Sequence, residues 1–218
     1  MGENESYAVG HLALGYILSK ISAKMFKTNL NIPLILTLSV IADIDLLIPF
    51  LQHRGPTHSI IVMLTVFAPF FTIYNKKAIP YFIALIQHSL IGDYLTGEVQ
   101  LLWPITTHSY GVNLSIQSQA NITIEWMSFV ACAFIMIKTN DVAKLLQPHI
   151  SNLTLTIPTF TVLLPTFLSF PLKVPHLLIP PHLFYIVIFL ASITIDLQFK
   201  LKRQKVRKKA DKNEKGQV

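Results

Sequence analysis

The sequence predicts an all-α fold, a polytopic bundle of about six to seven transmembrane helices. Of the 218 residues, 52% are apolar and only 13% are charged, whereas a soluble domain carries about 25% charged residues. The apolar residues form stretches close to the length of about 20 residues with which an α-helix crosses the hydrocarbon core of a membrane. Lysine and arginine residues gather between these stretches and after the last one. We therefore expect a multi-pass protein of the cell membrane.

Seven candidate membrane segments follow one another along the chain. They run approximately over residues 8–23, 32–51, 59–74, 78–95, 122–137, 154–172 and 177–197. The first segment is short and could instead lie in the interface or be re-entrant, so six crossings stay open beside seven. No basic region precedes it, and we expect it to be retained rather than cleaved as a signal peptide. Prolines are expected to kink or delay the last two segments: Pro158, Pro165, Pro180 and Pro181.

We divide the chain into a membrane domain, residues 1–199, and a basic tail, residues 200–218. The tail contains nine lysine and arginine residues against Asp211 and Glu214, and it therefore accounts for the whole net charge of +7. A basic block next to an apolar helix is typical of a cytoplasmic anchor close to anionic lipid. We expect a disordered cytoplasmic tail, membrane lipids as partners, and no nucleic acid.

The lysine and arginine residues also predict the orientation of the bundle, because cytoplasmic loops are enriched in them. When the tail is placed inside, only Arg54 and Lys173 of the 18 lysine and arginine residues fall on the outer side. An interfacial first segment would leave this assignment of the later loops unchanged. The ionisable residues within the apolar segments then lie near the outer face.

Ionisable residues inside a membrane are costly and are expected to be functional. Cys132 is the only cysteine, so thiolate clusters within one chain are excluded. The remaining histidine and aspartate residues favour a divalent metal ion, Zn²⁺ first and Mn²⁺ or Fe²⁺ as alternatives. The predicted ligands are His11, Asp43, Asp45, His53, His58, His88 and Asp93.

Regular α-helices would not bring these ligands together. At about 100° per residue, Asp43 and Asp45 would project about 200° apart, and His88 and Asp93 about 140° apart. We therefore expect a helix that ends or unwinds at the site, which residues such as Gly92 permit. Otherwise one member of each pair would bind the metal and the other would orient a ligating histidine through a hydrogen bond.

Three further residues are predicted to take part in the chemistry: Arg54, Thr57 and Glu125. Arg54 could hold an anionic group of the substrate through two parallel hydrogen bonds. Glu125 could instead pair with Arg54. Thr57 and Ser59 could cap the third segment, because their hydroxyl groups accept hydrogen bonds from free N–H groups at a helix start.

Several motifs in the first half of the chain resemble one family. They are Asp-x-Asp at residues 43–45, His-Arg-Gly-Pro-Thr-His-Ser at 53–59, His-x4-Asp at 88–93 and Trp-Pro at 103–104. The chain resembles the membrane-bound metal-dependent hydrolases, a family that includes LexA-regulated inner-membrane members, over about residues 10–125. The resemblance implies a metal-dependent hydrolase in the membrane, without naming a substrate.

The position of the site suggests what the substrate would be. A site at the level of the lipid headgroups favours an amphiphilic substrate, for example a lipid phosphoester. The alternative function is a metal-ion or proton-coupled transporter, in which the same groups would form an ion path. Polar groups gather on one side of the predicted bundle, whereas a path needs them along its whole length.

Overall fold

The computed structural model describes residues 7–48, 50–168 and 174–215, and over these ranges the regular structure is entirely helical. Four helical segments of the described part are long and apolar enough to cross a membrane, which confirms the predicted fold class at this level. Lys173, one of the two cations expected outside, falls outside the described residues. The four candidate spans are Ile60–Lys77, Gln119–Lys138, Ile150–Phe167 and His176–Lys205.

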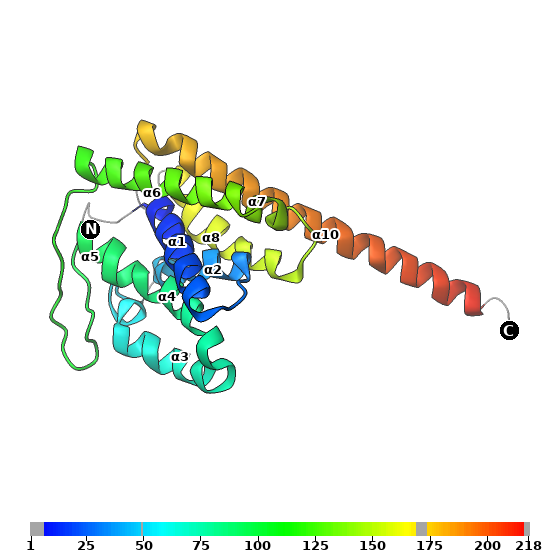
Figure 1. Ribbon diagram of the computed structural model, residues 1–218, viewed down its shortest axis with the longest axis horizontal. Helices are drawn as coiled ribbons and strands as arrows, with labels where there is room; N and C mark the ends of the chain where they lie inside the picture. The colour runs from blue at the N-terminus through cyan, green and yellow to red at the C-terminus, as the bar shows by residue number, and fades with distance from the viewer. Residues whose placement is uncertain (1–6, 49, 169–173, 216–218) are drawn as a thin grey trace.

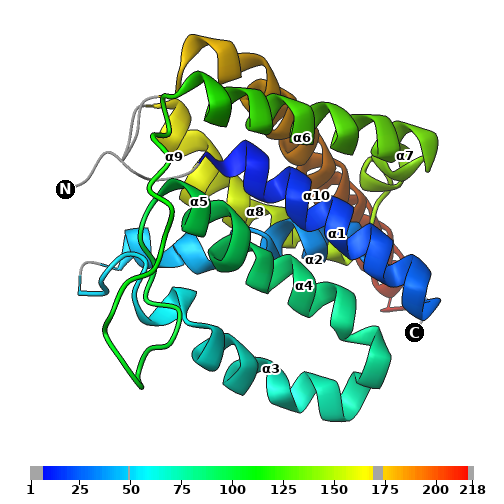
Figure 2. The same ribbon diagram turned by 60° about the vertical axis from the view of Figure 1, so that its left-hand side comes forward.

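Helix α1 (Ala8–Phe26) runs through the middle of the bundle, with α4 (Ile79–Gln87) on one side and α6 (Gln119–Lys138) on the other (Figure 2). The apolar side chains of its first half are mostly buried, among them Leu12 and Tyr16, whereas Ile21 and Met25 near its end are exposed. A helix surrounded by other helices carries its polar groups into the interior of the protein, where they need partners. The first predicted segment is therefore a central helix of the bundle.

The second predicted segment is not one continuous helix. Helix α2 (Ile32–Leu38) begins at Asn31, whose side chain accepts a hydrogen bond from the backbone N–H of Leu34, and it ends after seven residues. The chain then continues as a 3-10 helix, η1 (Ile41–Leu47). The expected interruption of the helix near the site is confirmed here.

The third segment begins after a short 3-10 turn, η2 (Pro56–His58), and forms α3 (Ile60–Tyr74). The Ser59 side chain caps α3 by accepting hydrogen bonds from the backbone N–H groups of residues 61 and 62. This confirms one of the two caps proposed from the sequence. A 3-10 turn, η3 (Asn75–Lys77), then leads into α4.

Helix α4 passes directly into a π-helix, η4 (His88–Asp93), and then into the short α5 (Tyr94–Thr96). The loop that follows returns along the same end of the bundle. Its backbone bonds to the start of α3, because the N–H of Ile60 donates to the carbonyl oxygen of Leu101. Later in the loop, the N–H groups of Val112 and Leu114 donate to the carbonyl oxygens of Tyr94 and Leu95 in α5, so the loop connects α5 to the start of α3.

The remaining helices form the other side of the bundle (Figure 1). Pro180 and Pro181 lie in the first turn of α10, where a helix tolerates proline because no earlier carbonyl needs its N–H. Pro158 and Pro165 flank the π-helix η6, so the sixth predicted segment is irregular between its two prolines. The elements are α7 (Asp141–Leu145), η5 (Ile150–Leu155), α8 (Thr156–Pro158), η6 (Thr159–Leu163), α9 (Leu164–Phe167), η7 (His176–Leu178) and α10 (Ile179–Lys215).

The basic segment from Lys200 onward was expected to be disordered, and the structure differs. Helix α10 continues without a break to Lys215 and projects beyond the bundle (Figure 1). Lysine, arginine and glutamine favour the helix, and adding residues to an existing helix avoids the cost of a new nucleus. The tail therefore extends the last helix rather than leaving it.

The end of the bundle that carries most of the lysines is held by a buried carboxylate. Asp141, at the start of α7, accepts hydrogen bonds from Tyr16 at 2.7 Å, from Thr139 at 2.8 Å and from Lys144 at 2.7 Å, and it also pairs with Lys20. Burial alone would raise the pKa of Asp141, but these donors hold it at about 2. The network ties α1 to the α6–α7 turn.

Candidate metal centre

Four ionisable side chains from three separated segments converge at the end of the bundle opposite Asp141. Asp43 comes from η1, His58 from η2, and His88 and Asp93 from η4. One ligand atom from each lies within 4.8 Å of the others, so the group could hold a metal ion. All four residues are buried.

The closest approaches are between imidazole nitrogens and carboxylate oxygens. His88 Nε2 lies 3.0 Å from Asp43 Oδ1 and 3.2 Å from Asp93 Oδ2. His58 Nε2 lies 3.1 Å from Asp93 Oδ2 and 3.5 Å from Asp43 Oδ1. Two imidazoles and two carboxylates around one point form a donor set that suits Zn²⁺, Mn²⁺ or Fe²⁺.

The π-helix explains how His88 and Asp93 meet. In a π-helix the N–H bonds to the carbonyl group five residues earlier, so His88 and Asp93 stand one turn apart on the same face. An α-helix over the same residues would turn them about 140° apart. The π-helix thus brings His88 and Asp93 onto one face without unwinding the segment.

The two aspartates of the 3-10 helix η1 face different partners. With about three residues per turn, residues two apart project in clearly different directions. Asp43 faces His88, whereas Asp45 faces His53 and Thr57, at 2.9 Å from His53 Nδ1 and 2.6 Å from Thr57 Oγ1. Asp43 therefore belongs to the four-residue group, whereas Asp45 lies beside that group.

In both His58 and His88, the ring nitrogen that faces away from the centre has an oxygen partner. His88 Nδ1 lies 2.9 Å from the backbone carbonyl oxygen of Ser39. A carbonyl can only accept, so Nδ1 carries a proton, and in a neutral His88 the lone pair of Nε2 would be available to a metal ion. His58 Nδ1 lies 3.3 Å from Asp45 Oδ2 in the same way. Metal-binding histidines are oriented by such contacts.

The centre has a strongly negative electrostatic environment. Burial alone would lower the pKa of His58, but the carboxylates of Asp43, Asp45 and Asp93 raise it well above its ordinary value. A potential that favours a proton on an imidazole also favours a divalent cation among the same oxygens.

Asp45, His53 and His58 form a second group that could hold an ion. It shares His58 with the first group, through the opposite ring nitrogen. Thr57 donates to Asp45 and lies 3.0 Å from His58 Nδ1. Thr57 does not cap α3, a role that the sequence analysis had left open for it. Its hydroxyl belongs to the hydrogen bonds around His58.

His11 lies beside the four-residue group and is absent from both ligand groups identified among the described residues. Its imidazole stacks on that of His88, with ring centroids 3.8 Å apart, and its Nε2 lies 3.6 Å from Asp93 Oδ1. A Cβ atom at position 92 would lie 2.1 Å from the His11 ring. Glycine at this position is therefore required for the close approach of α1 to the π-helix.

Arg54 is buried and points into the centre. Its Nη2 donates to Asp93 Oδ1 at 2.9 Å and to Thr96 Oγ1 at 3.3 Å. Its Nε has no hydrogen-bond partner among the described residues. The sequence left open a pair between Arg54 and Glu125, and the structure instead pairs Arg54 with Asp93.

Glu125 is a residue of α6 whose side chain lies against the start of α1. Its carboxylate accepts hydrogen bonds from the backbone of Tyr7 and Gly10, and a Cβ atom at position 10 would lie 2.7 Å from both carboxylate oxygens. The first N–H groups of an α-helix have no partner within the helix, and the carboxyl oxygens of Glu125 supply acceptors for them. Glu125 thus caps the helix that carries His11.

Two contributors to the site were not identified from the sequence. The Ser39 carbonyl is a backbone group, so no side-chain pattern could indicate it. The side-chain amide of Gln87 donates to the carbonyl oxygens of His11 and Ser39, at 3.1 and 3.4 Å. A polar residue inside an apolar segment is itself a signal of function or structure, and Gln87 could have been singled out on that ground.

Comparisons with known proteins place the chain in one family. The model of the YdjM inner membrane proteins matches residues 7–170, a range that includes every predicted site residue and extends beyond the expected 10–125. Neither the curated proteins nor the solved structures contain a significant match. Because the family match covers well over half of the 218 residues, the chain belongs to the YdjM inner membrane protein family, the LexA-regulated membrane-bound metal-dependent hydrolases.

Proposed function

We propose that this protein is a membrane-embedded hydrolase that binds a divalent metal ion through Asp43, His58, His88 and Asp93. The observation that carries the proposal is the convergence of four buried ligand atoms within 4.8 Å. The oxygen partners at the outer nitrogens of His58 and His88 add to it. Zn²⁺ is the first choice of ion, with Mn²⁺ or Fe²⁺ as alternatives.

The surrounding residues have separate tasks in this proposal. A divalent ion bound here would supply a Lewis acid and a water molecule of lowered pKa. Asp45, held by His53 and Thr57, orients His58. Arg54 balances the charge of Asp93, and its buried Nε, which has no hydrogen-bond partner among the described residues, would donate to an anionic group of the substrate.

We also propose six to seven crossings with the centre at the non-cytoplasmic face. His11 lies near the start of α1, and Lys24 lies in its last turn. Lys76 and Lys77 precede α4, whereas His88 follows it. In both helices the lysines thus lie at one end and the centre at the other. This arrangement supports a cytoplasmic position for the lysines.

The test is an assay of the purified protein against lipid phosphoesters and lipid amides in mixed micelles. We expect hydrolysis that is lost after chelation and restored by Zn²⁺ or Mn²⁺, with His108→Ala, a variant of a histidine in the loop after α5, as active as the wild type. Metal-loaded protein that cleaves nothing in the panel but moves ions across proteoliposome membranes would instead establish the transporter.

A further inference from the structure

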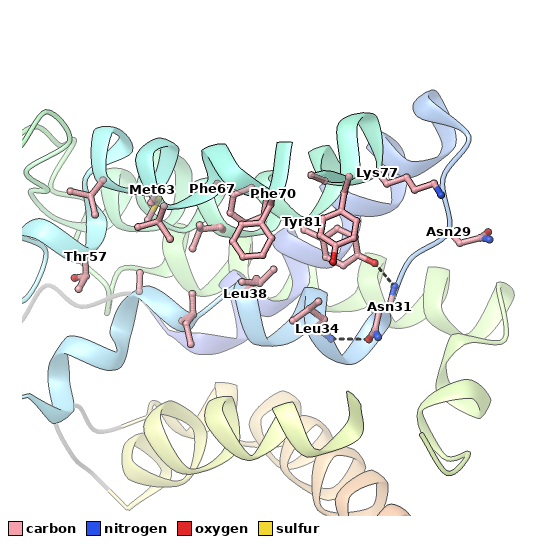
Figure 3. A pocket seen from close by; sticks show the side chains of 17 residues that line it. Asn29, Asn31, Leu34, Leu38, Thr57, Met63, Phe67, Phe70, Lys77 and Tyr81 are labelled. Atoms are coloured by element: carbon pink, nitrogen blue, oxygen red, sulfur yellow. Dashed lines mark hydrogen bonds between the residues drawn. The ribbon is translucent and has the colours of Figure 1, made fainter. Parts of the chain in front are cut away.

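A cavity of about 700 Å³ runs along one side of α3, between that helix, α2 and α4 (Figure 3). Its middle is lined by apolar side chains, among them Leu38, Met63, Phe67 and Phe70. Its volume falls in the range of about 300 to 1,000 Å³ that is usual for small-molecule sites. We call it the α3 groove.

One end of the α3 groove reaches the metal centre. Thr57 lines this end, and its hydroxyl donates to Asp45 and lies 3.0 Å from His58 Nδ1. Ala42, the neighbour of Asp43 in the chain, also lines the groove. The groove therefore ends next to Asp45 and His58 of the second group that could hold an ion, and one residue along the chain from Asp43 of the four-residue group.

The groove opens along a helix that faces lipid. Helix α3 belongs to a candidate membrane span, and Val66, Phe70 and Ile73 are 60%, 45% and 67% exposed. In a bilayer such side chains contact hydrocarbon, because water is absent at that depth. Val66 and Phe70 also line the groove, so a lipid chain could enter sideways from the membrane.

The far end of the groove is polar. Lys77 and Asn29 line it, and the Tyr81 hydroxyl accepts a hydrogen bond from the backbone N–H of Asn31 at 2.9 Å (Figure 3). The 15 residues of α3 span about 22 Å at 1.5 Å per residue. The apolar part is therefore long, and polar groups line the end that lies away from the metal centre.

We infer that the α3 groove holds one hydrocarbon chain of a lipid substrate, with the hydrolysable bond of that lipid at the metal centre. The hydrolysis step rests on the proposed function, whereas the position of the hydrocarbon chain rests on the groove itself. Hydrolysis would add one water across the bond: the hydroxyl joins the carbonyl carbon or the phosphorus, and the leaving oxygen or, for an amide, the leaving nitrogen takes the proton. The substrate class is thus a membrane amphiphile whose chain lies parallel to α3.

Photolabelling tests the occupant without requiring turnover. The probe is a single-chain phospholipid with a diazirine in the middle of its acyl chain, presented to the full-length protein in detergent. We expect cross-links to Phe67, Phe70 and Tyr81 that an excess of the unmodified lipid removes. Labelling spread equally over the exposed face of α6, at Val130 and Phe134, and insensitive to that excess would overturn the assignment.

Matched variants on α3 separate the groove from the lipid-facing surface. Met63→Trp fills the groove, and Val66→Trp blocks its opening at an exposed position where a larger side chain is tolerated. Leu64 is 44% exposed and is absent from the residues that line the groove, so Leu64→Trp is the control. We expect both groove variants to lose the groove cross-links and Leu64→Trp to retain them, with metal content unchanged in all three.

The two proposals fail in different ways. Groove labelling that Met63→Trp and Val66→Trp abolish, combined with no hydrolysis of any lipid, would support the chain assignment and contradict the hydrolase. Hydrolysis that is equally fast for long and short chains, and equally fast in Val66→Trp, would contradict the chain assignment and leave the hydrolase in place.

Discussion

The imidazole rings of His11 and His88 stack with their centroids 3.8 Å apart and their planes 23° from parallel. One residue comes from the first helix and the other from the π-helix that follows α4. The stack holds His88 from one side while the Ser39 carbonyl holds its Nδ1. The helix that carries His11 is in turn capped by Glu125, so α6 supports the centre through α1.

The close approach at Gly92 should be sensitive to one methyl group. Gly92→Ala would place a Cβ atom where the His11 ring lies and displace it from His88. Because contacts that orient a ligand typically change metal affinity by about 10- to 100-fold, we expect weaker Zn²⁺ binding by that factor. Competition with a fluorescent chelator would measure it. Leu90→Ala, at an exposed position of the same π-helix, should bind as the wild type does.

Removing either imidazole of the four-residue group should remove the metal. Elemental analysis of protein purified without chelator is expected to show stoichiometric metal in the wild type and loss in His58→Ala and His88→Ala. His108→Ala provides the matched histidine control, because His108 lies in the loop after α5. A metal-free wild type would contradict the site.

Arg54 should matter more for turnover than for metal binding. Arg54→Lys keeps a positive charge near Asp93 but cannot reproduce the planar set of donors. Loss of a charged hydrogen bond costs about 1.5 to 3 kcal/mol, which is roughly a 10- to 100-fold fall in rate if the contact acts in the transition state. Turnover and metal content measured on the same samples would check this. Equal loss of both would make Arg54 a residue that maintains the site.

The Asp141 network predicts a stability that depends on pH. Its pKa of about 2 lies below the ordinary 3.8, so its contribution is fully present above pH of about 4 and is lost as the pH falls toward 2. We expect Asp141→Asn to destabilise the protein at pH 7 by about 1.5 to 3 kcal/mol, through lost hydrogen bonds to a charged group. The difference in melting temperature from the wild type should shrink in acid. Glu98→Gln, at an exposed position of the loop after α5, should melt like the wild type at each pH.

The orientation can be tested with single cysteines in a Cys132→Ala background. Gln52 is exposed next to the centre, so a cysteine there should react with an impermeant thiol reagent added to intact cells. A cysteine at Lys209, in the basic part of α10, should react only after the cells are permeabilised. The opposite pattern would place the centre on the cytoplasmic side.

The sequence by itself determined the class of the fold, the family and the residues gathered at the centre. Apolar segments of membrane length, the distribution of lysine and arginine, and the Asp-x-Asp, His-Arg-Gly-Pro-Thr-His-Ser and His-x4-Asp motifs are local patterns, so they can be recognised without coordinates. The need for an irregular helix at the site was also predictable, because regular helical spacing would have kept His88 and Asp93 apart.

The tertiary structure decided which of these residues meet and in what role. The π-helix, rather than an unwound turn, brings His88 to Asp93, and the backbone oxygen of Ser39 orients His88. Glu125 caps α1 instead of pairing with Arg54. The α3 groove is formed by side chains far apart in the sequence. These features depend on packing between segments that are distant in the chain, and a local pattern of residues carries no record of such contacts.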